Sequence, residues 1–253
     1  MNMQNRLAII LARIAIVIAV LGLWEVLSRT GIVNPRLLPS ASDTCATLVE
    51  LLRRSSVQKD LMVTATEVLA AFALAVPFGA VIGFLVAENR YFAEVAKPLL
   101  FFAFSIPKSI FLPMFILVFG VGFAEKVGFG FFSTIFIVIM STTTAVESIK
   151  VEHLTVARSY GATPMQTAFR VYLPSMLPVL LEALRISMIF NLTGVILAEM
   201  YASRDGIGHQ IATWGENFQM KQLLAGVVMV AAIAMTFNEL VRWVETRCSH
   251  WRK

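Results

Sequence analysis

Long stretches without charged residues constrain this chain more than any other feature of its sequence. Residues 127–146 form a run of 20 uncharged residues, which is long enough to cross a bilayer as an α-helix. Only 15% of all residues are charged, against about 25% in soluble domains. Runs such as 68–87 are apolar on every side and do not alternate with period two, so they do not fit the strands of a membrane barrel. We therefore predict an all-α integral membrane protein.

Six segments of this kind divide the chain, so we predict six transmembrane helices in a single membrane domain, 1–253. Residues 1–60 would hold the first span and a surface helix, and residues 61–245 the core. Gly79 and Gly83 lie four residues apart in the second span and would allow close packing on a neighbouring helix. The predicted spans are 7–27, 61–87, 98–123, 127–146, 177–200 and 222–243.

The segments between the spans are polar. Ser42 or Asp43 could cap an amphipathic helix that runs to about Arg53 and lies on the membrane surface. We expect a charged turn at 88–97 and a polar loop at 201–221. A basic tail follows the last span, at 245–253.

The longest polar-leaning segment of the second half, 155–174, predicts a short and sharply bounded helix outside the hydrocarbon. Gly161 can adopt the left-handed conformation that ends a preceding helix. Thr163 is a good N-cap, Pro164 suits the first helical position, and Gln166 would complete a capping box with Thr163. A short, well-capped helix at a membrane surface suits insertion into a groove of a partner.

This segment resembles the EAA loop of the permease subunits of bacterial ABC importers. Its signature is Glu-Ala-Ala, three residues, Gly, nine residues and Ile-x-Leu-Pro, and every spacing is matched here. Thr155, Val156 and Val171 depart from the signature, whereas four positions agree: Ala157, Gly161, Leu173 and Pro174. Shorter stretches, including Leu37-Leu38-Pro39-Ser40 and Gly206-Ile207-Gly208, resemble the nitrate, sulfonate and taurine branch of the same family.

The resemblance implies a type I ABC importer permease fold with a cytoplasmic coupling helix, at 163–169. It implies a homodimer in the bacterial inner membrane, with both termini cytoplasmic, two ABC ATPase subunits that use ATP-Mg, and a periplasmic binding protein that delivers a small solute, for which an anion is one candidate. Met165, Ala168 and Phe169 would offer the ATPase an apolar face at i, i+3, i+4 spacing. The expected coupling residues are Ala157, Gly161, Ala162, Thr163, Pro164, Met165, Ala168, Phe169, Leu173 and Pro174.

Three polar residues within the spans are candidates for the translocation path. Lys108 follows Pro107, which should break the third helix, and its ammonium could face a polar path or reach toward the membrane surface. Asn191 could bond between helices or line the path. Glu199 is expected at the outer end of the fifth span, where its carboxylate would be exposed to water. A role for Glu199 in a gate or in a docking contact is the alternative.

No catalytic or metal-binding pattern appears in the sequence. A Gly-x-x-x-x-Gly-Lys-Ser/Thr phosphate loop is missing, so the chain should not hydrolyse ATP or bind a cofactor itself. The three histidines lie on different segments, the two cysteines are expected on opposite sides of the membrane, and no basic stripe with interleaved aromatics suggests nucleic acid. The alternatives are a secondary transporter or channel driven by an ion gradient, in which uptake persists without an ATPase, and a membrane enzyme.

Overall fold

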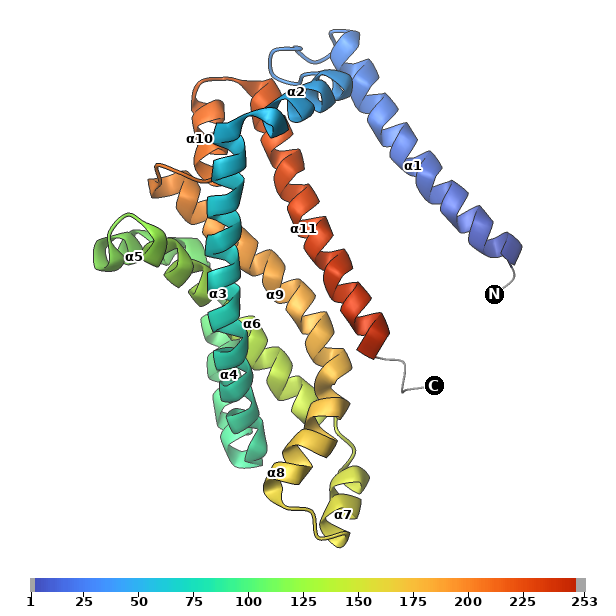
Figure 1. Ribbon diagram of the computed structural model, residues 1–253, viewed down its shortest axis with the longest axis vertical. Helices are drawn as coiled ribbons and strands as arrows, with labels where there is room; N and C mark the ends of the chain where they lie inside the picture. Colours follow the sequence, from blue (N-terminus) through green and yellow to red (C-terminus); the bar gives the residue numbers. More distant parts are fainter. Residues whose placement is uncertain (1–2, 249–253) are drawn as a thin grey trace.

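The computed structural model describes residues 3–248, and the predicted basic tail beyond residue 248 lies outside them. Within that range the regular structure is helical, and the order of the elements follows the chain in Figure 1. The α-helices are α1 (Met3–Arg29), α2 (Ala41–Arg53), α3 (Ser55–Glu88), α4 (Arg90–Ser105), α5 (Leu112–Phe119), α6 (Phe123–Glu147), α7 (Val151–Ser159), α8 (Pro164–Thr167), α9 (Leu173–Ala202), α10 (Ile207–Glu216) and α11 (Met220–Cys248). A 3₁₀ turn, η1 (Lys108–Phe111), precedes α5, and a π-turn, η2 (Ala168–Tyr172), joins α8 to α9.

The centre of the molecule is formed by α3, α6 and α9, which pack on one another. Two glycines of α3 make the close approach to α6, as their spacing predicted. A Cβ at Gly79 would lie 2.8 Å from the Cβ of Val138, and a Cβ at Gly83 would lie 2.6 Å from the carbonyl oxygen of Ile139. The two helices can pack at this distance because these positions carry no side chain.

Five helices are long and apolar enough to span a membrane, and a bent pair brings the number to six among the described residues. The pair joins residues 91–105 to residues 108–119 at an angle of 77°. The break predicted at Pro107 is confirmed, and the third span predicted at 98–123 falls on this bent pair. The charged turn expected at 88–97 is wrong, because the side chain of Asn89 accepts from the amides of Tyr91 and Phe92 and starts α4 there.

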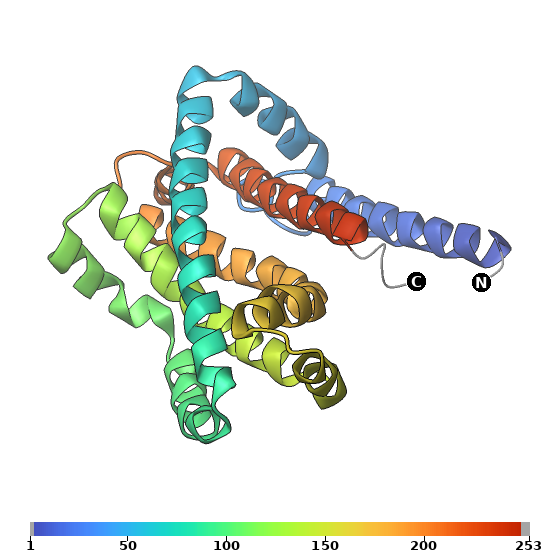
Figure 2. The same ribbon diagram turned by 60° about the horizontal axis from the view of Figure 1, so that its bottom comes forward.

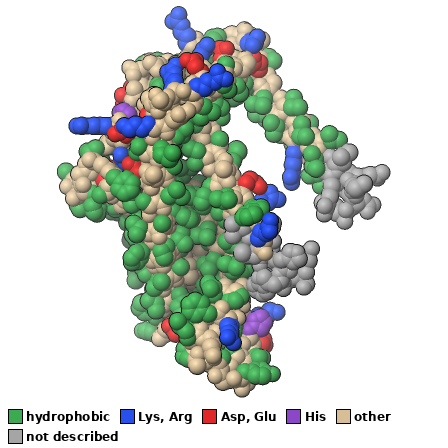
Figure 3. Space-filling model, viewed as in Figure 1, with side chains coloured by type: hydrophobic (Ala, Val, Ile, Leu, Met, Phe, Trp, Pro, Cys, Tyr) green, Lys and Arg blue, Asp and Glu red, His purple; other side chains and the backbone are tan. Residues whose placement is uncertain are grey.

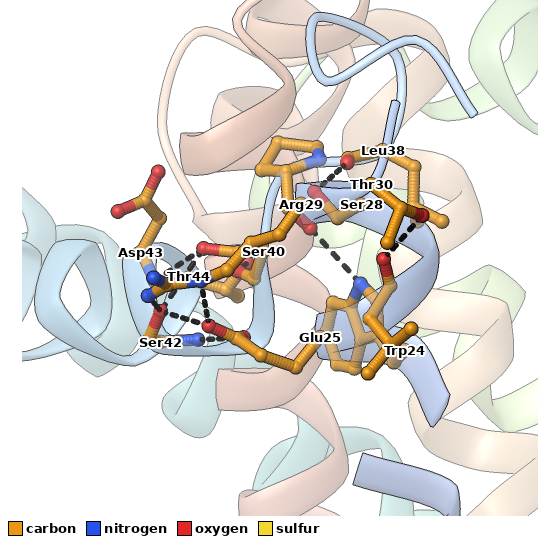
Figure 4. Close-up of polar contacts among 12 residues, drawn as sticks. Trp24, Glu25, Ser28, Arg29, Thr30, Leu38, Ser40, Ser42, Asp43 and Thr44 are labelled. Atoms are coloured by element: carbon orange, nitrogen blue, oxygen red, sulfur yellow. Dashed lines mark hydrogen bonds and ion pairs between the residues drawn. The ribbon is translucent and has the colours of Figure 1, made fainter. Parts of the chain in front are cut away.

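Helix α2 begins earlier than predicted. Its N-cap is Ser40, whose hydroxyl accepts a hydrogen bond of 3.1 Å from the amide of Asp43, so neither Ser42 nor Asp43 is the cap. Ser42 instead donates to the carboxylate of Glu25 in α1, both through its amide and through its hydroxyl. Figure 4 shows these contacts, together with the indole of Trp24, which donates to the carbonyl of Pro39. They fix the corner between α1 and α2.

Beyond that corner, α1 diverges from the bundle. Its apolar stretch is 0% buried within this chain, and Figure 2 shows it extending away from the other helices. In Figure 1, α1 rises from the N-terminus to the α2 and α10 end, and α11 runs from that end back toward the end that holds α7 and α8, so both chain ends point toward α7 and α8. In Figure 3, charged side chains gather at the α2 and α10 end, and the middle of the visible face is mostly hydrophobic, as expected of a surface that meets lipid.

The polar loop predicted at 201–221 contains a helix, α10, which the sequence reading missed. Ile207, Ile211 and Trp214 lie on one face of α10 and are buried against residues of α2, α3 and α11. Their i, i+4, i+7 spacing is the signal that could have identified it.

Candidate functional site

The first candidate site is the knob, which we define as residues 151–172: helix α7, the turn at Gly161, α8 and η2. Helix α7 ends as predicted at Gly161, whose φ is +70°. The amide of Gly161 donates to the carbonyl of Arg158, and the amide of Ala162 donates to the carbonyl of Ala157. Glycine fits here because a left-handed φ brings a Cβ too close to the backbone.

The capping box of α8 is confirmed. The hydroxyl of Thr163 accepts from the amide of Gln166 at 3.3 Å, and the side-chain oxygen of Gln166 accepts from the amide of Thr163 at 2.9 Å. Pro164 occupies the first turn. These contacts hold a turn of only four helical residues in place at the tip of the knob.

Helix α8 does not end sharply at its C-terminus, so the prediction of a helix bounded at both ends is wrong there. The chain continues through η2 into α9 without leaving a helical conformation, and Leu173 and Pro174 lie in the first turn of α9, where Pro174 marks the entry to the next apolar run as predicted. A π-turn accommodates an extra residue in a helix and is common at functional sites. Residues 164–202 therefore form one long helical element that starts at the knob.

The knob presents apolar side chains to the outside. Met165 is 68% exposed and Phe169 is 59% exposed, while Ala168 between them is half-buried. A cavity of about 520 Å³ lies beside α8, and Met165 and Ala168 line it together with Phe84, Arg158 and Tyr172. Phe84 and Tyr172 meet edge to face, with ring centroids 5.4 Å apart, and attach η2 to the end of α3.

Lys108, the first of the predicted path residues, caps the break in the third span. Its ammonium donates to the carbonyls of Ala103 and Ile106, each at 3.1 Å, and to the carbonyl of Phe104 at 2.5 Å. It also lies 4.7 Å from the ring centroid of Phe104. The last carbonyls of a helix have no partner within it, and here the ammonium supplies one.

Asn191 and Glu199 both belong to α9, and both are 0% exposed. The amide of Asn191 donates to the carbonyl of Val68 in α3 at 2.7 Å, which confirms the bond between helices. The exposed position expected for Glu199 is wrong. Its two oxygens accept from the hydroxyl of Thr64 at 2.6 Å and from the amide of Gly208 at 2.7 Å, and these bonds offset the cost of burial.

A polar stripe on α3, which the sequence reading missed, contacts the same region. Asp60, Thr64 and Glu67 are buried on one face of the helix, and their spacing of four and three residues is the signal that could have revealed them. Glu67 accepts a hydrogen bond of 3.1 Å from the ammonium of Lys126 in α6. Their side chains are 2% and 6% exposed, so this ion pair lies inside the bundle.

One carboxylate near these helices lies outside the spans. Asp205, in the turn before α10, accepts a hydrogen bond of 2.9 Å from the ammonium of Lys59, and this bond lowers the pKa of Asp205. Among residues 3–248, no group of three or more His, Cys, Asp or Glu side chains is arranged to hold a metal ion.

The family of the chain follows from its sequence and its fold together. Residues 75–250 match the family described as the inner membrane component of binding-protein-dependent transport systems. The chain belongs to this family. It is therefore a multi-pass membrane permease subunit of an ABC importer, a class whose ATPase is a separate subunit and which works with a binding protein. The ion-gradient alternative and the membrane-enzyme alternative are set aside.

Relatives of known name cover most of the chain. The taurine transport system permease protein TauC of Escherichia coli is 24% identical over 236 residues, which cover 91% of this chain and 86% of the relative. The putative aliphatic sulfonates transport permease protein SsuC of Bacillus subtilis is 25% identical over 233 residues, which cover 92% of this chain and 84% of the relative. The formylaminopyrimidine transport permease protein ThiX of Halalkalibacterium halodurans is also 25% identical.

The fold resembles that of a chain in an inward-facing structure of the MetNI methionine ABC transporter. The TM-score is 0.65 and the identity is 19%, and the match covers 80% of this chain and 98% of the other. This likeness shows the type I importer permease fold that the sequence predicted.

Proposed function

We propose that this permease works as a homodimer that admits a small sulfonate-like anion, and that an ATPase subunit holds each copy by its knob. The relatives named for taurine and for aliphatic sulfonates support the substrate class. The observation that carries the coupling role is the exposed apolar pair Met165 and Phe169, on a turn fixed by its capping box. Exposed aromatic and Met side chains on a rigid turn suit a groove of a partner.

In this proposal the knob and both termini lie in the cytoplasm, and the α2 and α10 end faces the binding protein. Ala157, Gly161 and Ala162 set the angle of α8, and Thr163 and Pro164 hold its first turn. Met165, Ala168 and Phe169 enter the ATPase. Leu173 and Pro174 join the knob to α9.

The path would run between the two copies of the chain, as the dimer proposal requires. ATP binding would draw the knobs together and open the path outward, and hydrolysis would reset it. Lys108 stays a candidate for the path. The path-lining role predicted for Asn191 and Glu199 also stays a prediction, and their burial within one copy favours a role in holding helices together.

Co-purification tests the coupling role. Met165→Glu combined with Phe169→Glu should lower recovery of the ATPase subunit with the tagged permease by about tenfold or more, because charges replace buried apolar contacts at the centre of the proposed interface. Ile32→Glu is the matched control, since Ile32 is 72% exposed at the other end of the molecule. Unchanged recovery with the double variant would remove the knob as the docking site.

Uptake tests the substrate class. Proteoliposomes that hold the complex, with its binding protein outside and ATP inside, should accumulate labelled taurine or an alkanesulfonate, and unlabelled methionine should not compete. Accumulation of neither sulfonate would overturn the substrate assignment while leaving the coupling role to the co-purification experiment.

A further inference from the structure

The start of α10 is held by side chains from two other helices. Three successive backbone amides donate to three different residues: Gly206 to Asp60 at 3.0 Å, Ile207 to Thr64 at 2.9 Å and Gly208 to Glu199 at 2.7 Å. These are first-turn amides, which have no partner within the helix itself. We call Asp60, Thr64 and Glu199 the α10 cradle.

The α10 cradle is closed to water and tightly fitted. Its side chains are at most 5% exposed. A Cβ at Gly206 would lie 2.1 Å from a carboxylate oxygen of Glu199, and a Cβ at Gly208 would lie 2.6 Å from the carbonyl oxygen of Ile196. Gly206 also has a φ of +104°, which favours glycine. The two glycines let the backbone of α10 contact α9 directly.

Glu199 is the member of the α10 cradle that belongs to α9. One of its oxygens accepts from Gly208 of α10, and the other accepts from the Thr64 hydroxyl, which itself receives the amide of Ile207. Glu199 therefore acts on two of the three amides, one directly and one through Thr64. Loss of its carboxylate would leave the amide of Gly208 buried without this acceptor.

Helix α9 connects this contact to the knob. Residues 164–202 are one helical element, with α8 and η2 at one end and Glu199 three residues from the other. Figure 1 shows α8 and α10 at opposite ends of α9. A displacement of α8 along or about this element would therefore be carried to the end of α9 that contacts α10.

We infer that Glu199 is a positioning residue that makes α10 follow α9, so that a movement of the knob is repeated at the opposite face of the membrane. The inference rests on the proposed function, because the ATPase must move the knob. It assigns to Glu199 the transmission of that movement, and to α10 the role of the element that moves on the outer face.

Two spin labels test this link in the complete complex with its ATPase subunits. With Cys45 and Cys248 replaced by serine, one form carries Glu216→Cys on α10 and another carries Arg158→Cys on α7, both at exposed positions. The measurement is the change in label mobility and in accessibility to a water-soluble relaxation agent when ATP and vanadate are added. In the otherwise unchanged chain both labels should respond.

Glu199→Leu should separate the two responses. The response at Glu216 should fall by about fivefold or more, the size of a typical coupling between sites, while the response at Arg158 stays within about twofold. Glu199→Gln should restore the response at Glu216, because its amide oxygen can accept from Gly208 and the Thr64 hydroxyl can turn to the carbonyl of Asp60, 3.1 Å away. Thr193→Val is the matched control, since that hydroxyl bonds within α9.

Four results would overturn the inference while leaving the proposed function intact. Two concern Glu199→Leu: an unchanged response at Glu216, or equal loss of both responses, which indicates a general structural role. Failure of Glu199→Gln to restore the response would exclude the hydrogen bonds as the link. In the otherwise unchanged chain, a label at position 216 that does not respond while the label at position 158 does would also overturn the inference. If neither label responds in that chain, the proposed function fails and the inference fails with it.

Discussion

At the scale of single residues, two lysines inside the spans have specific partners. Lys108 donates to three carbonyls at the end of α4, and Lys126 of α6 donates to Glu67 of α3. Each arrangement lowers the cost of placing a charge in the membrane, which is roughly 2.5–3.5 kcal/mol at a helix centre. The structure thus gives these lysines a stabilising task that can be separated from transport.

For Lys108, we expect Lys108→Met to lower the thermal stability of the purified permease, because three carbonyls lose a charged donor. Each of these hydrogen bonds contributes at most about 1.5–3 kcal/mol to the free energy of unfolding. The midpoint of unfolding in detergent measures this. A Lys108→Met protein that unfolds at the original temperature but no longer supports uptake would instead place this ammonium in the path.

For the ion pair, Lys126→Met should destabilise the protein by about 3 kcal/mol or more, because the carboxylate of Glu67 is left buried without its cation. The double variant Lys126→Met with Glu67→Leu should recover most of the loss. Unfolding midpoints of both single variants and the double variant complete the cycle. Additive losses would show that the two side chains do not depend on each other.

At the scale of elements, the knob depends on backbone conformation as much as on contacts. A Cβ at Gly161 would meet nothing within 4 Å, so any penalty for a side chain there comes from its φ of +70°. We expect Gly161→Val to lower recovery of the ATPase subunit with the permease, because the turn costs a β-branched residue about 1–2 kcal/mol.

Gly161→Asn is the control for that prediction, since asparagine tolerates the left-handed conformation. It should retain most of the ATPase recovery. Equal loss with asparagine and valine would mean that the side chain itself blocks docking, and the conformation of the turn would not be the cause.

The same scale shows why some elements were predictable. Gly161, Thr163 and Gln166 act through neighbours in sequence, so their roles could be read from spacing alone. The α10 cradle could not be predicted from sequence spacing, because Asp60 and Gly206 are 146 residues apart and meet only in the folded bundle. Glu199 was misplaced for the same reason: the sequence showed a carboxylate near a helix end, while its partners lie on α3 and α10.

At the scale of the whole molecule, the direction of the helices relates the termini to the knob. In Figure 1, α1 runs from the N-terminus away from the α7 and α8 end and α11 runs back toward it, so both chain ends lie on the same side, as six crossings require. We expect a green fluorescent protein fused after Lys253 to fluoresce, and an alkaline phosphatase fused after Ile32 to be active, because the first folds in the cytoplasm and the second outside it. The reverse pattern would invert the proposed orientation and place the knob out of reach of an ATPase.

The buried pair of Glu67 and Lys126 also sets a condition on biosynthesis. The two residues are 59 positions apart, and a ribosome adds about 5–20 residues per second. The carboxylate of α3 is therefore made roughly 3–12 seconds before its cation. During that interval Glu67 lacks the cation that pairs with it in the folded protein, so we expect α3 to stay beside the insertion machinery until α6 arrives.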